Sequence, residues 1–356
     1  MQRPAAETRA RARDRVLRVG PFSVRWRRRT VVVSLVLLLG LIAAATSSLA
    51  QGAYAVPADQ VLAAVLGLGS DVVRYTVGEL RMPRTLTGIV VGFALGLSGA
   101  ITQTVTRNPI ASPDVLGVTA GASLGAVSVI ALGGPAAASP LGIPAAALLG
   151  GLLTAATIFA LSWRRGADSL RLIITGIAIN AVLVALVSWM LVLAQLSRAV
   201  SANVWLIGSL DGATWTTVAP AAILTAILAL VTGGAARLLP ALALGEDTAS
   251  ALGVRPGRAR TTLLLLSVSL AAVGVAAAGP IGFIAFAAPQ LALRIAGASS
   301  PPLLCSGLLG ALLVTGSDLL LRVVSPVPLP VGIMTTLIGG PFLIYLIIRI
   351  NRRRSA

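Results

Sequence analysis

Apolar runs about as long as a lipid bilayer is thick recur along almost the whole chain. A helix needs roughly 20 apolar residues to cross about 30 Å of hydrocarbon, because each helical residue adds about 1.5 Å. Of the 356 residues, 56% are hydrophobic and only 11% are charged, whereas soluble domains carry roughly 25% charged residues. The chain is therefore expected to be an all-α, polytopic membrane protein without a separate soluble domain.

The runs predict about ten membrane-spanning helices. They lie at 30–50, 84–106, 115–132, 143–162, 171–195, 215–234, 261–279, 282–297, 302–324 and 329–349. The eighth run is short and begins at the break "AGPIGF", so nine spans is the alternative to ten. The spans would form one domain, 30–350, between an Arg-rich tail, 1–29, and a short basic tail, 351–356.

The arginines favour an even number of spans with both termini in the cytoplasm. All 28 basic residues are arginine, and basic residues in short loops stay on the cytoplasmic side. With ten spans, the arginines left outside are Arg74, Arg81, Arg84, Arg198 and Arg322. We expect the N-terminal tail to be disordered and held near anionic lipid headgroups. Nucleic-acid binding by the tail, or signal-peptide cleavage at "SSLAQ", is the less favoured reading.

Missing residue types exclude several chemistries. The chain has no lysine and no histidine, so it lacks the lysine of a Walker-type ATP site and the histidines of triads, zinc sites and proton relays. Its single cysteine, Cys305, allows no internal disulfide and is interpreted as a packing residue. We expect no catalytic residue, no metal site and no cofactor bound by this chain. An intramembrane enzyme and an ion-coupled transporter with paired intramembrane acids are both disfavoured.

Small residues four apart mark the second run as a central helix. Gly88, Gly92, Gly96 and Ala100 would form a groove along one helix face, where the backbone of a neighbouring helix can approach closely.

Three arginines adjoin spans on the side that should avoid them. Arg81 and Arg84 begin the second run, and Arg322 ends the ninth. Because guanidinium groups match carboxylates, these residues suggest a docking surface for an acidic partner. The alternatives are interfacial anchoring and, for Arg322, an ion pair with Asp318 four residues earlier, which would weaken its docking role.

The segment "LGEDTASALGV" lies between two cytoplasmic turns and is punctuated by Gly245 and Gly253. It is either a surface helix on the bilayer or a helix that fits a groove in a cytoplasmic partner.

Five stretches together resemble a known family. They are "LRMPRTLTGIVVGFALGLSGAITQTVTRNPIASPDVLGVTAGASLG", "NVWLIGSLDGATW", "LGEDTASALGV", "GPIGFIAFAAPQLALRIAG" and "DLLLRVVSPVPLPVGIMTTLIGGPFLIYLI". In this order they are similar to FecCD-type permeases of bacterial iron-siderophore, haem and cobalamin ABC importers. The resemblance implies a type II importer fold in a bacterial plasma membrane. It implies two permease subunits, two ATP-binding subunits that hold ATP and Mg²⁺, and an extracytoplasmic substrate-binding protein.

The resemblance also implies roles for individual residues. The binding protein would dock on Arg81, Arg84 and Arg322. The coupling helix that inserts into the ATPase would contain Gly245, Glu246, Ala249, Leu252 and Gly253. The cytoplasmic gate would contain Asn108, Pro109 and Ile110, with a second part at Ser169 and Leu170. The pathway would be lined by Asn180, Ser188, Gln195, Thr335 and Thr336, from the fifth and tenth spans.

The expected function is import of a ferric siderophore by alternating access. Gln290 stands where the family often has histidine, which resembles ferric-siderophore permeases more than cobalamin permeases. Pro328 stands where many members have glutamate, which puts the last extracellular turn in doubt. A cobalamin or haem permease of the same family is the alternative, and an ion-coupled secondary transporter is a more distant one.

Overall fold

The computed structural model is a bundle of ten long helices. It describes residues 15–19, 22–52, 55–162, 169–325, 327 and 329–354. The long helices are α1 (Arg28–Ala50), α4 (Met82–Thr106), α5 (Val118–Leu132), α7 (Gly142–Ser162), α8 (Ser169–Leu193), α10 (Trp215–Ala235), α13 (Pro256–Ala278), α14 (Ile284–Ala296), α15 (Leu303–Val324) and α16 (Val331–Arg354). Each corresponds to one predicted span, so the prediction of ten is confirmed.

Length and composition divide these helices into two classes. Seven are long and apolar enough to cross a membrane, and α5, α14 and Val331–Leu346 of α16 are shorter apolar helices. Helix α14, with 13 residues, is about 20 Å long at about 1.5 Å per residue. The eighth span is therefore present as a helix but is short, as its sequence suggested.

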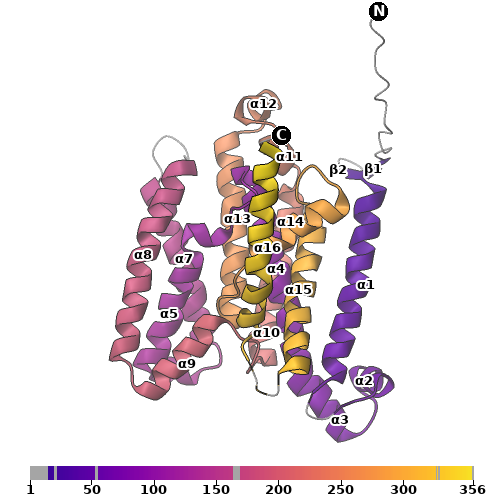
Figure 1. The fold of residues 1–356 in the computed structure, drawn as a ribbon, viewed down its shortest axis with the longest axis vertical. Helices are drawn as coiled ribbons and strands as arrows, with labels where there is room; N and C mark the ends of the chain where they lie inside the picture. Colours follow the sequence, from indigo (N-terminus) through magenta and orange to yellow (C-terminus); the bar gives the residue numbers. More distant parts are fainter. Residues whose placement is uncertain are drawn as a thin grey trace, which may run out of the picture.

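The bundle has a central group of helices and two flanks. Helix α4 packs against α13, α14 and α15, while α5, α7 and α8 form one flank and α1 packs against α15 on the other (Figure 1). The main apolar core lies where α4 meets α13, around Ile101, Leu263 and Leu270. Among the helices long enough to cross a membrane, α4 and α13 are the most buried.

Short elements cover the two ends of the bundle. Helix α1 begins and α16 ends at the same end, called here the terminal end, where α11 (Leu238–Ala243) and α12 (Glu246–Ala251) also lie (Figure 1). At the opposite, far end lie α2 (Ala58–Val65), α3 (Asp71–Tyr75) and α9 (Leu196–Ile207) (Figure 1). The remaining short helices are α6 (Pro135–Ala138) and the 3₁₀ helix η2 (Pro113–Leu116).

Helices α4 and α15 touch through their backbones. A Cβ added at Gly92 would overlap the carbonyl oxygen of Gly310, and one added at Gly96 would overlap that of Ser306. Only residues without a side chain fit such a contact. The predicted small-residue groove is confirmed, and its partner is α15. Cys305 of α15 is fully buried, as expected for a packing residue.

Two boundaries differ from the sequence prediction. Helix α3 continues through the π-helix η1 (Thr76–Arg81) into α4, so one helical segment runs from Asp71 to Thr106. Helix α16 continues to Arg354 and includes most of the basic tail 351–356. Backbone hydrogen bonds of a helix do not require lipid, so a helix can extend past its apolar run.

The N-terminal tail is not wholly without regular structure, contrary to expectation. Strands β1 (Arg15–Val19) and β2 (Phe22–Trp26) pair antiparallel, with Arg15 opposite Trp26 and Val19 opposite Phe22. Valine, phenylalanine and tryptophan favour strands, and these residues outweighed the high density of arginine on which the expectation of disorder was based.

Candidate functional site

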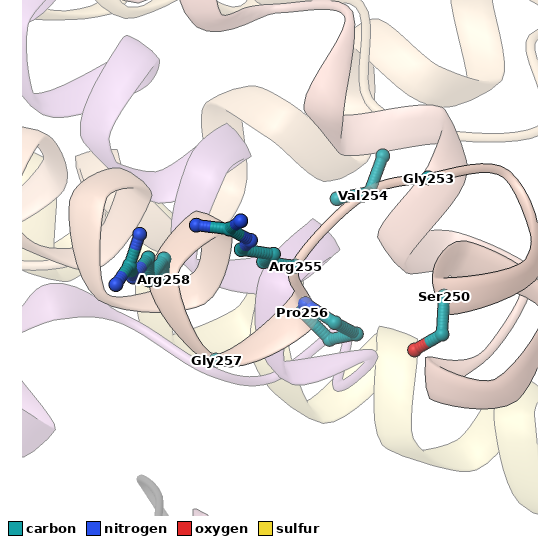
Figure 2. Close-up of a pocket in the computed structure, with 7 residues that line it drawn as sticks. All are labelled: Ser250, Gly253, Val254, Arg255, Pro256, Gly257 and Arg258. Carbon is teal, nitrogen blue, oxygen red and sulfur yellow. The ribbon is translucent and has the colours of Figure 1, made fainter.

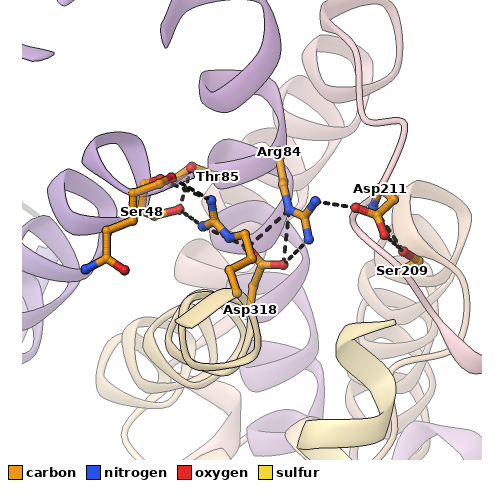
Figure 3. Close-up of polar contacts among 8 residues, drawn as sticks. Ser48, Arg84, Thr85, Ser209, Asp211 and Asp318 are labelled. Carbon is orange, nitrogen blue, oxygen red and sulfur yellow. Dashed lines mark hydrogen bonds and ion pairs between the residues drawn. The ribbon is translucent and has the colours of Figure 1, made fainter. Parts of the chain in front are cut away.

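The far end of the bundle holds a network of charged side chains. Asp318 of α15 lies at its centre with a side chain that is 3% exposed. The Arg84 guanidinium donates to both Asp318 carboxylate oxygens, from Nη2 at 2.7 Å and from Nε at 3.1 and 3.2 Å (Figure 3). Arg322 pairs with the same carboxylate at 3.0 Å. The expected pair of Asp318 with Arg322 is confirmed, and Arg84 shares it.

Two of the three predicted docking arginines hold the end of α1. Arg81 donates to the carbonyl oxygens of Leu49 at 2.8 Å and Ala50 at 3.0 Å. Arg322 donates to the Ser48 carbonyl at 3.1 Å and to the Ser48 hydroxyl. The last carbonyls of a helix lack partners inside the helix and attract positive charge. These two arginines therefore have a structural role, whatever else they bind.

Arg84 lies between a buried and an exposed carboxylate. Besides Asp318, it forms an ion pair with Asp211, whose side chain is 43% exposed (Figure 3). Asp211 belongs to the loop before α10, and Ser209 bonds both its amide and its carboxylate. The amide of Ser209 in turn donates to the Ala278 carbonyl at 2.8 Å. Arg84 thus links the buried Asp318 to a carboxylate that faces solvent.

Sequence reasoning missed Asp211 and Ser48. Asp211 was part of the stretch "NVWLIGSLDGATW" but had no role assigned. Its position as an acid in an outer loop of a chain with only 11 acidic residues was an available signal. Ser48 is fully buried and bonds Thr85 at 2.8 Å. No local pattern distinguishes it from the other serines near it.

The predicted gate forms a compact turn at the terminal end. The amide of Asn108 donates to the Gln103 carbonyl at 3.2 Å, which closes the end of α4. The Asn108 side-chain oxygen accepts from the amide of Ile110 at 3.0 Å. Asn108, Pro109 and Ile110 are all exposed. The turn is held by its own hydrogen bonds and leaves Ile110 exposed, and its role as a gate stays a prediction.

The second predicted gate segment lies at the start of α8. Ser169 and Leu170 are the first two residues of this helix. Their side chains lie outside the described part of the structure, so this prediction stays as made.

The predicted coupling segment forms the short helix α12, which projects at the terminal end. It begins after Gly245, whose φ is +119°, and is followed by Gly253 with φ +78°. Ala249 is fully buried, whereas Leu252 is 62% exposed. Glu246 pairs with Arg260 of α13 at 2.8 Å. The helix is thus attached to α13 through Glu246, and Leu252 remains exposed to solvent.

A basic hollow adjoins the coupling segment. It has a volume of about 550 Å³, and its lining includes Ser250, Val254, Arg255 and Arg258 (Figure 2). Arg255 and Arg258 are exposed, and within the described residues neither guanidinium has a hydrogen-bond or ion-pair partner. The hollow is therefore positively charged.

The predicted pathway residues fall into two groups. Asn180 and Ser188 of α8, Gln195 before α9 and Thr336 of α16 are exposed. Thr335 is buried and donates to the Gly332 carbonyl at 3.1 Å. Of the two predicted threonines of α16, only Thr336 is therefore exposed in this conformation.

Comparison with known proteins decides the family. A sequence model described as the FecCD transport family matches residues 37–349. The chain belongs to the FecCD transport family. It is 39% identical over 328 residues to the ferric enterobactin transport system permease protein FepG of Escherichia coli, covering 92% of this chain and 98% of FepG. It is 38% identical over 285 residues to the hemin transport system permease protein HmuU of Yersinia pestis, covering 78% and 84%.

A solved structure supports the same assignment. It is described as an inward-facing conformation of a metal-chelate type ABC transporter. The superposition has a TM-score of 0.79 at 29% identity and covers 89% of this chain and 99% of the other. This FecCD member is therefore a multi-pass plasma-membrane permease of the ABC transporter class, with the type II permease fold. The sequence-based recognition is confirmed.

Two departures from the family pattern have different outcomes. Gln290 is buried in α14, where its amide donates to the side-chain oxygen of Gln103 at 2.7 Å. Gln103 in turn donates to the Phe286 carbonyl at 3.1 Å. Gln290 thus joins α14 to α4 inside this FecCD protein. Pro328 lies outside the described residues.

Proposed function

We propose that the chain is the permease subunit of an ATP-driven importer of a ferric siderophore. The observation that carries the proposal is the similarity to FepG over nearly the full length of both chains. The similarity to HmuU makes a haem permease the second candidate.

The proposed assembly contains five further components. A second permease subunit completes the path, two ATP-binding subunits hold ATP and Mg²⁺, a binding protein delivers the substrate, and a bilayer surrounds the bundle. The terminal end faces the cytoplasm in this proposal, because most of the arginines in the described parts of the tails and short loops lie there. The far end faces the binding protein.

Four regions of the chain have distinct roles in the proposal. The ATPase binds α12 through Leu252, and the binding protein contacts Arg84, with Arg81 and Arg322 behind it. The turn Asn108–Ile110 closes the cytoplasmic mouth, with Ser169 and Leu170 as its second part. The exposed polar residues of α8 and Thr336 line the path. ATP binding in the partner shifts α12, and the helices rock to expose the path to one side at a time.

Reconstitution tests this function. The chain, its ATP-binding subunits and its binding protein are placed in liposomes, and ATP-dependent uptake of ferric enterobactin, haemin and cobalamin is compared. We expect uptake of the ferric siderophore, which survives ionophores that collapse proton and sodium gradients. Uptake of haemin or cobalamin alone would show that the proposed substrate is wrong. Uptake abolished by the ionophores would show that an ion gradient drives transport.

A further inference from the structure

Arg107, which no prediction assigned a role, joins two regions of the terminal end. It directly follows α4 and directly precedes the mouth turn Asn108–Ile110. Its guanidinium donates to the Leu242 carbonyl oxygen from Nε at 3.0 Å and from Nη2 at 2.5 Å. Leu242 lies in α11, 135 residues further along the chain. A side chain of the gate thus holds the segment that leads into the coupling helix.

Leu242 lies at the junction between a buried and an exposed element. In α11, Leu239 is 6% exposed and Leu242 is 3% exposed, and both belong to the main apolar core that includes Val105 of α4. Two residues further on, Leu244 is 65% exposed. The Leu242 carbonyl is therefore at the point where a segment fixed in the core becomes one that projects outward.

Arg107 has a left-handed backbone conformation, which arginine rarely adopts. Its φ is +52°, and the only other described residue with positive φ that is not glycine is Phe283. In the left-handed region glycine avoids the crowding of Cβ, and glycine or asparagine commonly follows the end of a helix. Keeping arginine there needs a reason other than the turn, and the bonds to Leu242 supply one.

Two attachments fix the coupling segment to different central helices. The Glu246–Arg260 ion pair attaches α12 to α13, and Arg107 attaches α11 to the end of α4. Of these, only Arg107 is continuous with the mouth turn. Movement that shifts the end of α11 would therefore reach the turn through this side chain, alongside the apolar contacts of α11 with α4.

We propose that Arg107 is a positioning residue that transmits movement of the coupling segment to the mouth turn. The proposal rests on the proposed function, because it assumes that α12 binds the ATPase and that the turn closes the path. A purely structural residue, in contrast, would stabilise the end of α11 without affecting transmission. Removing the guanidinium would impair transmission to the turn in the first case and would only destabilise the end of α11 in the second.

The test uses the complete reconstituted transporter with Arg107→Gly, Arg107→Lys and the control Arg237→Gln, which changes an exposed arginine at the same end of the bundle. Glycine suits the backbone, so the glycine variant removes the side chain without straining the turn. We expect this variant to retain its melting temperature, ATPase association and ATP hydrolysis. Ferric siderophore imported per ATP should fall at least about tenfold, the loss expected for one hydrogen bond from a charged donor. Lysine should restore part of this ratio, and the control should match wild type.

A second readout reports on the turn itself. In a Cys305→Ala background, which has no other cysteine, Ile110→Cys is labelled with a membrane-impermeant maleimide before and after vanadate trapping of the ATPase. Labelling should change on trapping with Arg107 and should not change with glycine at that position.

Three results would overturn the proposal. One is a normal import ratio with a normal labelling change in the glycine variant. Another is loss of folding or of ATPase association in the same variant, which would make the residue structural. The third is a control variant that loses coupling equally. If the wild-type transporter hydrolyses ATP but imports no ferric siderophore while Ile110→Cys labelling still depends on Arg107, the proposed substrate fails and this inference stands.

Discussion

Replacing Asp318 by asparagine should test the charged network at the far end. The carboxylate is 3% exposed and is shared by Arg84 and Arg322, which are 21% and 18% exposed. At an effective dielectric constant of about 20, each pair contributes roughly 4 kcal/mol of attraction at about 4 Å. Desolvation offsets much of this attraction, and removing one partner of a buried pair costs about 3–5 kcal/mol. Because both arginines keep some contact with solvent, we expect a loss of about 3 kcal/mol.

The assay is thermal unfolding of the purified protein in detergent or nanodiscs. A loss of this size should lower the apparent melting temperature by on the order of 5 °C in a chain of this length. Asp71→Asn is the matched control, because Asp71 pairs with Arg74 at the same end but is 92% exposed, and such pairs contribute less than about 1 kcal/mol. Removing a second charge, in Asp318→Asn/Arg322→Met, should recover part of the loss. If Asp318→Asn and Asp71→Asn have the same melting temperature, the buried carboxylate does not stabilise the far end.

Three further predictions concern docking, coupling and packing. Arg84→Glu should weaken capture of the binding protein more at low than at high salt; equal capture by both forms in a pull-down at each salt concentration would refute docking there. Leu252→Asp should leave membrane insertion intact and abolish ATPase copurification, because it places a charge in an apolar contact; normal recovery of the complex would refute the coupling assignment. Gly92→Ala should greatly reduce the yield of folded protein, since its Cβ overlaps a backbone carbonyl, whereas Gly316→Ala, with open space around it, should fold normally; equal yields in size-exclusion chromatography would contradict the α4–α15 contact.

The number and order of the helices could be predicted from the sequence because hydrocarbon imposes one length on every span. Their ends could not, since a helix can continue into water once its apolar run is over. Hydropathy placed the start of the second span at residue 84, but the helical segment begins at Asp71. The π-helix Thr76–Arg81 within this segment has no apolar signature.

The candidate sites were predictable only where a local pattern carried them. The Asp318–Arg322 pair followed from a spacing of four residues on one helix. Arg84 and Asp211 are 127 residues apart, and their pairing depends on how the loop before α10 packs against α13. The bond of Arg107 could not be predicted, because its partner is a backbone carbonyl and leaves no trace in residue identity.

Helix α4 carries Arg84 near one end and ends at Thr106, directly before Arg107. Its 25 residues make a rod of about 37 Å at about 1.5 Å per residue, with no proline after Pro83 to bend it. Close backbone contact with α15 opposes sliding of this rod, so a displacement at one end is carried along its length. A tilt of about 5° about one end would swing the other by roughly 3 Å over that length, enough to lift a side chain such as isoleucine out of van der Waals contact.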